Sequence, residues 1–351
     1  LNWKVRTMKA HLVGSVGLPT VDEVFSTVGR MLGAHLARIP DGEPGGRRVW
    51  VNWQYPVFLG NPFLQLGDES DRANRGARLL RLKLADGVRP EDVRFGELGY
   101  SREARASYAD FLRARQAGMF PKSMRFQVCL PTPINVAGTA CAPAALLSIE
   151  PAYERAMLEE IARLCAAIPH DDLCIQFDMV REVLWWDGRL LATQPAPFSA
   201  AAVREQVLSR LSRLCMAVPQ SVQLGFHFCY GDWSGRHQIE PLDTTAMVEL
   251  ANALALRAGR GLTYIHLPVP IARKDAEYFG SLQTLELSSS TEVFLGLIHL
   301  SDGVSGSRER AAAARRFLPK FGFATECGLG RAKTPAMVLD ILEIHAALCA
   351  A

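Results

Sequence analysis

Short apolar runs alternate with longer amphipathic stretches along almost the whole chain, and this rhythm constrains the fold more than any other feature. The runs that predict buried strands are residues 11–16, 36–40, 125–130, 173–177, 222–229, 262–267, 293–300 and 321–325. Between them, apolar residues at helical spacing predict helices at 21–32, 101–116, 152–167, 201–217, 244–257, 308–317 and 335–348. Thr20 and Ser199 are predicted N-caps, and Thr334 with Pro335 predicts the start of the last helix. Such alternation is typical of parallel strands joined by crossover helices.

Eight strand-like runs favour a closed (β/α)8 TIM barrel over an open doubly wound sheet. An open sheet that binds a dinucleotide would carry Gly-x-Gly-x-x-Gly after its first strand, whereas residues 14–19 read Gly-Ser-Val-Gly-Leu-Pro. A TIM barrel typically has about 250 residues, and more with insertions. The 351 residues, 49% of them hydrophobic, therefore predict one α/β domain over residues 8–351.

Two long segments, 42–90 and 185–199, interrupt the rhythm and predict insertions on the barrel rim. The first carries several aromatic residues, among them Trp50, Trp53 and Tyr55, and its charged stretch at 68–86 predicts a helix. Long excursions on a barrel often serve as lids or partner surfaces. An aromatic flap that packs on the rim for stability is the alternative.

Composition excludes several classes of partner. The net charge is only +3 and no basic stripe is interleaved with aromatic residues, which argues against nucleic acid. No apolar run reaches the roughly 18 residues of a membrane span. The eight cysteines are scattered and lack the tight spacing of a disulfide framework, which predicts a reducing, cytoplasmic environment.

The run His227-Phe228-Cys229 places an imidazole and a thiol on the same face of a predicted strand, because residues i and i+2 share a face. A neutral imidazole nitrogen and a thiolate sulfur form half of a zinc site, which Cys327 could complete from a later strand end. His-x-Cys alone is weak evidence, since the pattern also occurs by chance in packed cores.

Polar residues recur at the carboxyl ends of the predicted strands, which converge on one mouth of a barrel. They are Ser15, Asp41, Glu43, Gln176, Asp178, His227, Cys229, His266, His299 and Cys327. Three of the eight histidines occupy equivalent strand-end positions, which favours a shared site over isolated core histidines. The sequence therefore predicts a zinc site at this mouth.

Six short blocks follow one another in order along the chain. They are His11-Leu12-Val13-Gly14-Ser15, Asp41-Gly42-Glu43-Pro44, Gln176-Phe177-Asp178, His227-Phe228-Cys229-Tyr230, Ile298-His299-Leu300-Ser301 and Glu326-Cys327-Gly328-Leu329. Together they resemble the C-terminal catalytic barrel of cobalamin-independent methionine synthase and its shorter relatives, over nearly the whole chain from about Met8.

This resemblance implies a zinc ion held by His227, Cys229 and Cys327 that keeps an acceptor thiol as a thiolate. It also implies roles for residues of the other blocks. Gly14, Ser15, Glu43 and Asp178 would hold the amino and carboxylate groups of a homocysteine-like substrate, and His299 and Asp178 would be the catalytic residues. His299 would assist proton transfer to the leaving group.

The chain departs from the family at the fourth zinc ligand. His266 stands where the family has a glutamate ligand, and it is the favoured fourth ligand here. Asp232, His237, Glu240 and Glu249, which lie in the long segment before it, are the alternatives.

A second departure concerns the methyl donor. Met179 replaces a second carboxylate of the family, and residues 131–137 lack its folate-stacking tryptophan. These changes argue against a folate donor, although Trp185, Trp186, Trp50 or Trp53 could supply another stacking surface.

The predicted function is zinc-dependent transfer of a methyl or small alkyl group from a small-molecule donor to a zinc-activated thiol, with homocysteine as the default acceptor. A methoxy compound, a corrinoid protein or an epoxide could replace folate as the donor. The alternatives are a zinc-dependent lyase or hydrolase, and a non-catalytic barrel with a structural zinc. The sequence does not assign the oligomeric state.

Overall fold

The computed structural model describes residues 9–72, 78–189, 196–231, 237–331 and 333–350. Its main sheet has seven strands, and each neighbouring pair is parallel. In spatial order they are β1 (Arg38–Pro40), β4 (Arg125–Pro131), β5 (Leu173–Met179), β6 (Gln223–Phe228), β7 (Tyr264–Pro268), β8 (Glu292–Ile298) and β9 (Gly322–Thr325). The sheet curls into a half-barrel, and seven of the eight predicted strands are confirmed.

The predicted first strand at 11–16 does not form a ladder. Ala10 makes isolated parallel bridges to Leu36 and to Phe323, so this segment lies between the two edges of the sheet. The described residues therefore form a curled seven-stranded sheet with an N-terminal segment in its gap, and not the closed eight-stranded barrel that the sequence predicts.

Amide side chains hold part of this segment. The carbonyl of Leu12 accepts a hydrogen bond from Gln127 Nε2 at 2.9 Å, and the carbonyl of Val13 accepts one from Gln176 Nε2 at 2.5 Å. The next backbone bridge joins Ser15 to Gly42, so the segment is fixed by side chains between two isolated bridges.

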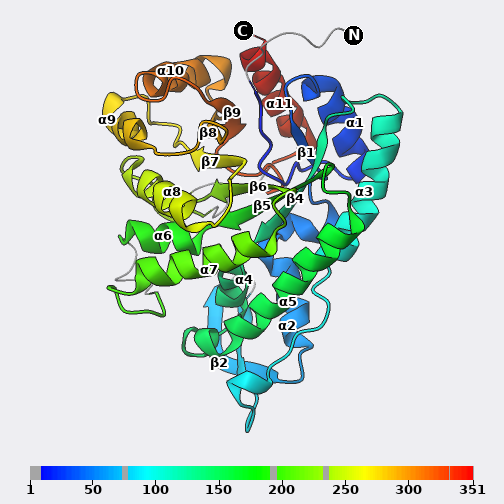
Figure 1. The fold of residues 1–351 in the computed structure, drawn as a ribbon, viewed down its shortest axis with the longest axis vertical. Helices are drawn as coiled ribbons and strands as arrows, with labels where there is room; N and C mark the ends of the chain where they lie inside the picture. The colour runs from blue at the N-terminus through cyan, green and yellow to red at the C-terminus, as the bar shows by residue number, and fades with distance from the viewer. Residues whose placement is uncertain (1–8, 73–77, 190–195, 232–236, 332, 351) are drawn as a thin grey trace.

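Long helices cover the outside of the sheet (Figure 1), with α1 and α3 on the opposite side from α8 and α10. They are α1 (Val21–Leu32), α3 (Tyr100–Gln116), α5 (Leu146–Ala167), α7 (Val203–Ala217), α8 (Thr245–Arg257), α10 (Gly303–Arg315) and α11 (Pro335–Cys349). Shorter elements are α4 (Pro133–Ala140), α6 (Arg181–Asp187) and α9 (Ala276–Phe279), and the 3-10 turns Pro90–Asp92, Pro143–Ala145 and Gly280–Thr284.

The predicted caps hold at two of three helices. The side chains of Thr20 and Thr334 accept hydrogen bonds from the first turns of α1 and α11. Ser199 is not the N-cap of α7, which begins later, at Val203, after Ala202. No helix of the described residues is long and apolar enough to cross a membrane.

The segment 42–90 contains the 3-10 helix η1 (Gly45–Gln54), the short helix α2 (Tyr55–Leu59) and an antiparallel hairpin of β2 (Leu64–Arg72) and β3 (Arg78–Leu84). The predicted helix at 68–86 is wrong. From Leu80 onward leucine alternates with a charged residue, which is the period of a strand.

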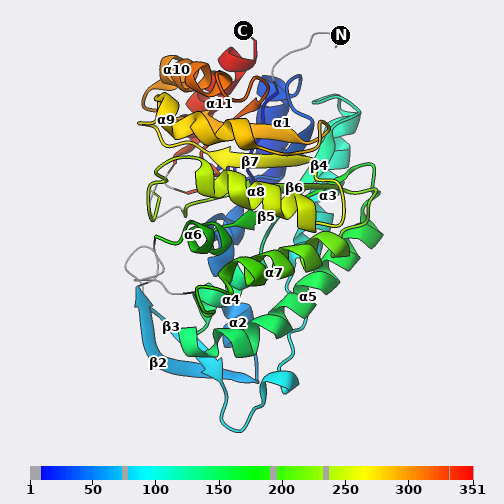
Figure 2. The same cartoon turned by 60° about the vertical axis from the view of Figure 1, so that its left-hand side comes forward.

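The hairpin lies beside α4 and α5 and far from β7 and β8 (Figures 1 and 2). Leu82 is buried and forms a bridge with Cys141, which fixes the hairpin to the α4–α5 connection. The insertion therefore extends the molecule at one end of the sheet, while Trp50 of η1 reaches a cavity at the strand ends.

Candidate metal centre and substrate cavity

Three soft ligands meet inside the curled sheet. His227 is on β6, Cys229 follows β6, and Cys327 follows β9. The sulfurs of Cys229 and Cys327 are 3.9 Å apart, and Cys327 Sγ is 3.8 Å from His227 Nε2. One ligand atom from each of the three residues lies within 4.8 Å of the others. The structure thus brings together the three residues that the resemblance assigns to zinc.

Hydrogen bonds determine which nitrogen of His227 is available. His266 Nε2 is 3.0 Å from the carbonyl oxygen of Thr325, which can only accept, so His266 carries its proton on Nε2. His266 Nδ1 is 2.7 Å from His227 Nδ1 and must accept from it. Burial, followed by the charge of His227, holds the pKa of His266 well below its ordinary value, which keeps that ring neutral. Nε2 is therefore the nitrogen of His227 that faces Cys327 and is open to a metal ion.

The thiols of Cys229 and Cys327 have pKa values shifted in opposite directions. The hydrogen bond from Cys229 holds the pKa of Cys327 well below its ordinary value, against the effect of burial. The same bond and burial raise the pKa of Cys229. The pair therefore carries one negative charge readily, and a cation between the sulfurs would favour the loss of the second proton.

The donor set fits zinc. Two thiolates and a neutral imidazole are preferred zinc ligands, with Zn–S distances of about 2.3 Å. Two sulfurs bound to one tetrahedral centre at that distance lie about 3.8 Å apart, close to the 3.9 Å between Cys229 and Cys327. The two sulfurs are therefore already spaced as a pair that shares one ion.

A cavity of about 490 Å³ opens onto these ligands. Its lining comes from the strand ends and from η1: Val13, Gly14, Ser15, Glu43, Arg48, Trp50, Asp178, Val180, His227, Cys229, Cys327, Gly328 and Arg331. All four residues predicted to bind substrate therefore border the same cavity as the three soft ligands.

Ser15 also has a structural contact. Its hydroxyl accepts a hydrogen bond from Gly330 N at 3.0 Å, and its carbonyl accepts one from Leu329 N at 2.7 Å. A Cβ at Gly328 or Gly330 would clash with the Ser15 side chain. Ser15 thus holds the loop that carries Cys327 as well as lining the cavity.

Two carboxyl groups of the cavity have raised pKa values. Burial raises the pKa of Asp178 to about 6, although His227 and a 2.8 Å hydrogen bond from Gln176 act in the opposite direction. Burial, Asp178 and Asp41 together raise the pKa of Glu43 to about 8. A bound ammonium group would reverse these shifts, because a nearby positive charge favours the ionised carboxylate.

Backbone strain accompanies Glu43. It has φ of 51°, an uncommon conformation for a residue with a side chain, and its amide donates to Asp41 Oδ1 at 3.0 Å. Asp41 in turn pairs with Arg47 at 2.8 Å. Asp41 therefore anchors the turn and Glu43 projects into the cavity, a placement typical of strained functional residues.

Two arginines and a tryptophan were missed by the sequence analysis as parts of this cavity. Arg48 and Arg331 line it, and Trp50 lines it from η1. Arg48 lies five residues after Glu43, and Arg331 lies four residues after Cys327. Their proximity to two recognised blocks was the available signal, but a basic residue in a loop has no periodicity that predicts its direction.

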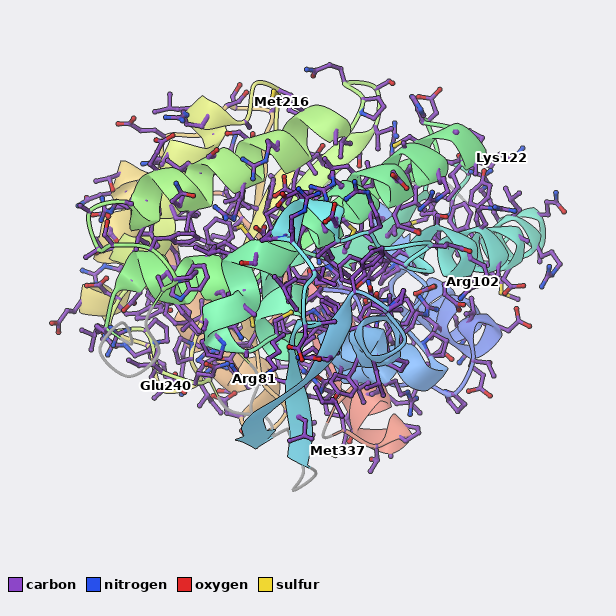
Figure 3. All side chains as sticks on the ribbon, turned by 90° about the horizontal axis from the view of Figure 1, so that it is seen from below. Arg81, Arg102, Lys122, Met216, Glu240 and Met337 are labelled. Atoms are coloured by element: carbon purple, nitrogen blue, oxygen red, sulfur yellow. The ribbon has the colours of Figure 1, made fainter. Side chains whose placement is uncertain are left out.

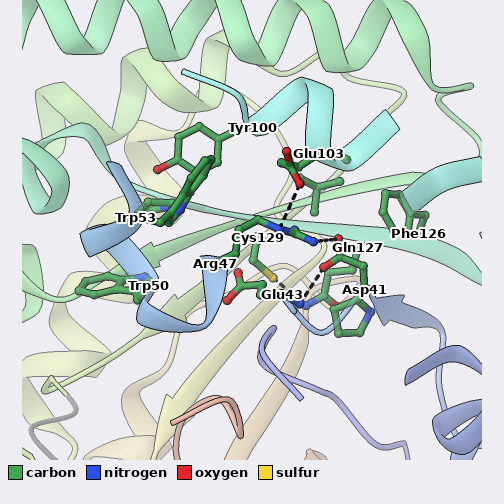
Figure 4. A pocket seen from close by; sticks show the side chains of 14 residues that line it. Asp41, Glu43, Arg47, Trp50, Trp53, Tyr100, Glu103, Phe126, Gln127 and Cys129 are labelled. Atoms are coloured by element: carbon green, nitrogen blue, oxygen red, sulfur yellow. Dashed lines mark hydrogen bonds and ion pairs between the residues drawn. The ribbon is translucent and has the colours of Figure 1, made fainter. Parts of the chain in front are cut away.

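Trp50 also borders two neighbouring cavities. One, of about 520 Å³, includes Asp41, Arg47 and Glu103, and Figure 4 shows Trp50, Trp53 and Tyr100 together on one side of it. The other, of about 430 Å³, is lined by Trp50, Asn135, Thr139, Val180, Arg181, Leu184, Trp185 and Gln238. Met179 is fully buried. Trp186 is buried beneath Arg204. Trp50 and Trp185 are therefore the candidate stacking residues for a ligand in the 430 Å³ cavity, called the third cavity below.

The predicted catalytic His299 lies outside the lining of these cavities. Its Nε2 donates to the carbonyl of Val269 at 2.8 Å, and its Nδ1 is 3.8 Å from a carboxylate oxygen of Glu326. Burial lowers the pKa of His299 despite the opposing charge of Glu326. His299 therefore neighbours the residue that precedes Cys327, and does not contact the soft ligands.

His237, Glu240 and Glu326 form a second group that could bind a cation. His237 Nδ1 is 3.0 Å from Glu240, and its Nε2 is 2.9 Å from Glu326. Burial alone would lower the pKa of His237, but the two carboxylates raise it to about 10. Glu240 is mostly exposed at the surface of the molecule (Figure 3).

None of the alternative fourth ligands that the structure describes joins the three soft ligands. Glu249 pairs with Arg204 at 2.7 Å, and His237 and Glu240 belong to the second group. Asp232 lies outside the described residues. His266 is in contact with His227, but through a hydrogen bond.

The fold is shared with solved methyltransferase structures. No protein-family model matches the sequence, and no curated protein matches it. A B12-independent methionine synthase from Shewanella sp. W3-18-1, in complex with selenomethionine, has a TM-score of 0.58 at 15% identity, covering 97% of each chain. A candidate vitamin-B12-independent methionine synthase from Listeria monocytogenes has a TM-score of 0.60 at 12% identity, covering 99% of this chain and 98% of that one.

A methyltransferase from Methanosarcina mazei is also similar, with a TM-score of 0.51 at 14% identity, covering 99% of this chain and 95% of that one. At such identities the likeness establishes the fold. The neighbours are of the class that the six sequence blocks resemble.

Proposed function

We propose that this protein transfers a methyl or small alkyl group to the thiol of a homocysteine-like amino acid, with zinc as its cofactor. The observation that supports this proposal is a single cavity bordered at one end by His227, Cys229 and Cys327 and elsewhere by carboxyl groups and arginines. A thiol, an ammonium and a carboxylate on one small molecule would each meet a complementary group.

The soft ligands define the thiol end. A zinc ion held by His227 Nε2, Cys229 and Cys327 would keep the acceptor sulfur deprotonated and nucleophilic at neutral pH, where a free thiol with pKa of about 8.5 is mostly protonated. The chain contributes a buried environment and a His227 tautomer that is already set.

The other end of the cavity would bind the amino acid. Glu43 and Asp178 suit the ammonium, since burial is the main cause of their raised pKa values and a positive charge beside them would favour their ionised forms. Arg48 and Arg331 suit the carboxylate, since guanidinium groups form charge-assisted pairs with carboxylates.

The third cavity is the proposed donor subsite. It adjoins the acceptor cavity at Trp50 and Val180, which line both. Helix α4, which follows β4, contributes Asn135 and Thr139 where a folate enzyme of the resembled family would present its stacking tryptophan. Neither side chain offers an aromatic face, which favours a donor other than folate.

His299 stays a predicted proton-transfer residue on the donor side. It reaches the donor subsite only indirectly, because Glu326 contacts both His299 and His237, and Gln238, which follows His237, lines the third cavity.

Binding and turnover together test the proposal. Zinc-loaded and metal-free protein are titrated with homocysteine and with ethanethiol by calorimetry, and product formation is followed by mass spectrometry with methoxy, epoxide, methyl-corrinoid and methyltetrahydrofolate donors. Homocysteine should bind the zinc-loaded form far more tightly than ethanethiol. Equal binding with and without zinc would contradict the proposal.

The donor series tests the expectation about folate. Loss of a stacking face and of a polar edge partner should weaken a folate by at least about a hundredfold, since a few kcal/mol are removed. Methyltetrahydrofolate should therefore yield little methionine. Efficient turnover with it would return the chain to the methionine synthase reaction.

A further inference from the structure

His266 lies behind His227, on the side away from the cavity. It is fully buried on β7, its ring centre is 4.8 Å from that of His227, and it does not line the acceptor cavity. Both of its ring nitrogens are engaged, one by His227 and the other by the carbonyl of Thr325.

We propose that His266 is a positioning residue and not a zinc ligand: it accepts the Nδ1 proton of His227 and thereby presents His227 Nε2 to the metal. This inference rests on the proposed zinc site. A histidine that binds a metal usually donates its other N–H to an oriented acceptor, which fixes the tautomer and increases the basicity of the ligating nitrogen. Here the acceptor is a second imidazole, itself oriented by a backbone carbonyl.

The contacts of His266 separate this role from coordination. Its Nδ1 is 2.7 Å from His227 Nδ1, which is a hydrogen-bond distance and involves the nitrogen of His227 that does not face Cys327. The group of residues whose ligand atoms lie within 4.8 Å of one another is His227, Cys229 and Cys327, without His266. The other nitrogen of His266 points to Thr325, at the end of β9.

Coordination by His266 would also leave buried polar groups unpaired. His266 would have to turn away from the carbonyl of Thr325, and His227 Nδ1–H would lose its acceptor. A buried polar group that loses its partner has no water to replace it, so the folded protein is destabilised. The existing arrangement satisfies both groups while leaving His227 Nε2 directed at Cys327.

Zinc absorption spectroscopy on the wild-type protein tests the assignment without any substitution. The fine structure should contain two sulfurs and one imidazole, the latter identified by multiple scattering from its ring. Two imidazoles would overturn the inference while leaving the zinc site intact. Absence of zinc binding would instead contradict the proposed function, and histidine NMR of the metal-free protein would then decide the tautomers of His227 and His266.

Two substitutions test the hydrogen bond. His266→Gln keeps a carbonyl acceptor for His227 and an amide donor for Thr325, whereas His266→Phe keeps a ring and removes both. His266→Phe should weaken zinc binding by about 10–100-fold, the usual effect of losing such a partner, and His266→Gln should restore most of it. Zinc affinity is measured by chelator competition.

His11→Phe is the matched control, because His11 is also buried, its ring centre is 5.9 Å from that of His266, and it bonds to Gln176 instead of a soft ligand. It should leave zinc affinity near that of the wild type. Equal weakening by His266→Gln and His266→Phe, with the sulfur count unchanged and one imidazole lost, would show that His266 is a ligand after all.

Discussion

Two histidine-centred clusters lie on either side of the Glu326–Cys327 peptide bond. His227, Cys229 and Cys327 gather within the curled sheet, whereas His237, Glu240 and Glu326 gather nearer its rim. Both clusters bring three potential metal ligands within 4.8 Å. They differ in what faces the histidine: a neutral ring and a thiol in the first, and two carboxylates in the second.

This difference determines how readily each histidine can offer a nitrogen lone pair to a metal ion. His227 donates through Nδ1 to a neutral acceptor, so its Nε2 is the nitrogen that faces Cys327. His237 lies between two carboxylates, which raise its pKa to about 10, so at neutral pH both of its nitrogens carry protons. Proximity of ligand atoms alone therefore does not identify a metal site, because a cation would first have to displace a proton from His237.

Cys327→Ser and Glu326→Gln compare the clusters at neighbouring positions. The serine variant should lose zinc affinity by about two orders of magnitude or more, because a soft thiolate ligand is removed. The glutamine variant should change zinc affinity by less than about tenfold, because its side chain faces His237. Chelator competition measures both affinities. Comparable losses in the two variants would show that the clusters act as one metal site.

Glu43→Gln tests whether Glu43 binds the ammonium group of the acceptor through its negative charge. It should weaken homocysteine by about 10–100-fold, the value of a charged hydrogen bond, and should leave ethanethiol almost unchanged. Calorimetry with both thiols gives the ratio directly.

The number of protons released on binding gives an independent measure of the contact between Glu43 and the ammonium group. Because the pKa of Glu43 is raised to about 8, an ammonium group should drive out its proton at pH 7. Wild-type protein should therefore release more protons with homocysteine than with ethanethiol, and Glu43→Gln should abolish that excess. An identical excess in the variant would assign the proton to another group.

The smallest expected effect concerns the second cluster and pH. The folded pKa of His237, about 10, is above its ordinary 6.5, so its ion pairs stabilise the fold fully below about pH 6.5 and are lost as pH rises through 10. Because Glu240 is 64% exposed, screening limits this contribution to about 1–2 kcal/mol.

His237→Gln removes this contribution and isolates it from the titration of the nearby Tyr230 and His299. The free energy of unfolding of the variant should be lower than that of the wild type at pH 7, and the gap should close toward pH 10. A gap that is constant over this range would mean that His237 is not held as an imidazolium.

Hydrophobic period and strand direction account for the parts of the site that could be predicted from the sequence. His227 and Cys229 share a face because they are two residues apart, and Cys327 reaches them because parallel strands end at one edge. The same reasoning placed Glu43 and Asp178 at the mouth, where both line the cavity.

Most of the wrong or incomplete predictions involve contacts between side chains and backbone. Such contacts produce no periodic pattern in the sequence. The segment after Ala10 has a strand pattern, but Gln127 and Gln176 use its carbonyls. At β3, charged residues alternate with leucines, and their charge was given more weight than their period. For His266, strand position predicts an inward direction, but only the carbonyl of Thr325 reveals which nitrogen carries the proton.

The central claim is that an acceptor thiol meets a zinc ion held by His227, Cys229 and Cys327. Zinc absorption spectra of the wild-type protein, recorded with and without homocysteine, test it most directly. The account predicts two sulfur neighbours in the free protein and three when homocysteine is bound, with no third sulfur when 2-aminobutyrate replaces it. A sulfur count that homocysteine leaves unchanged would contradict the claim.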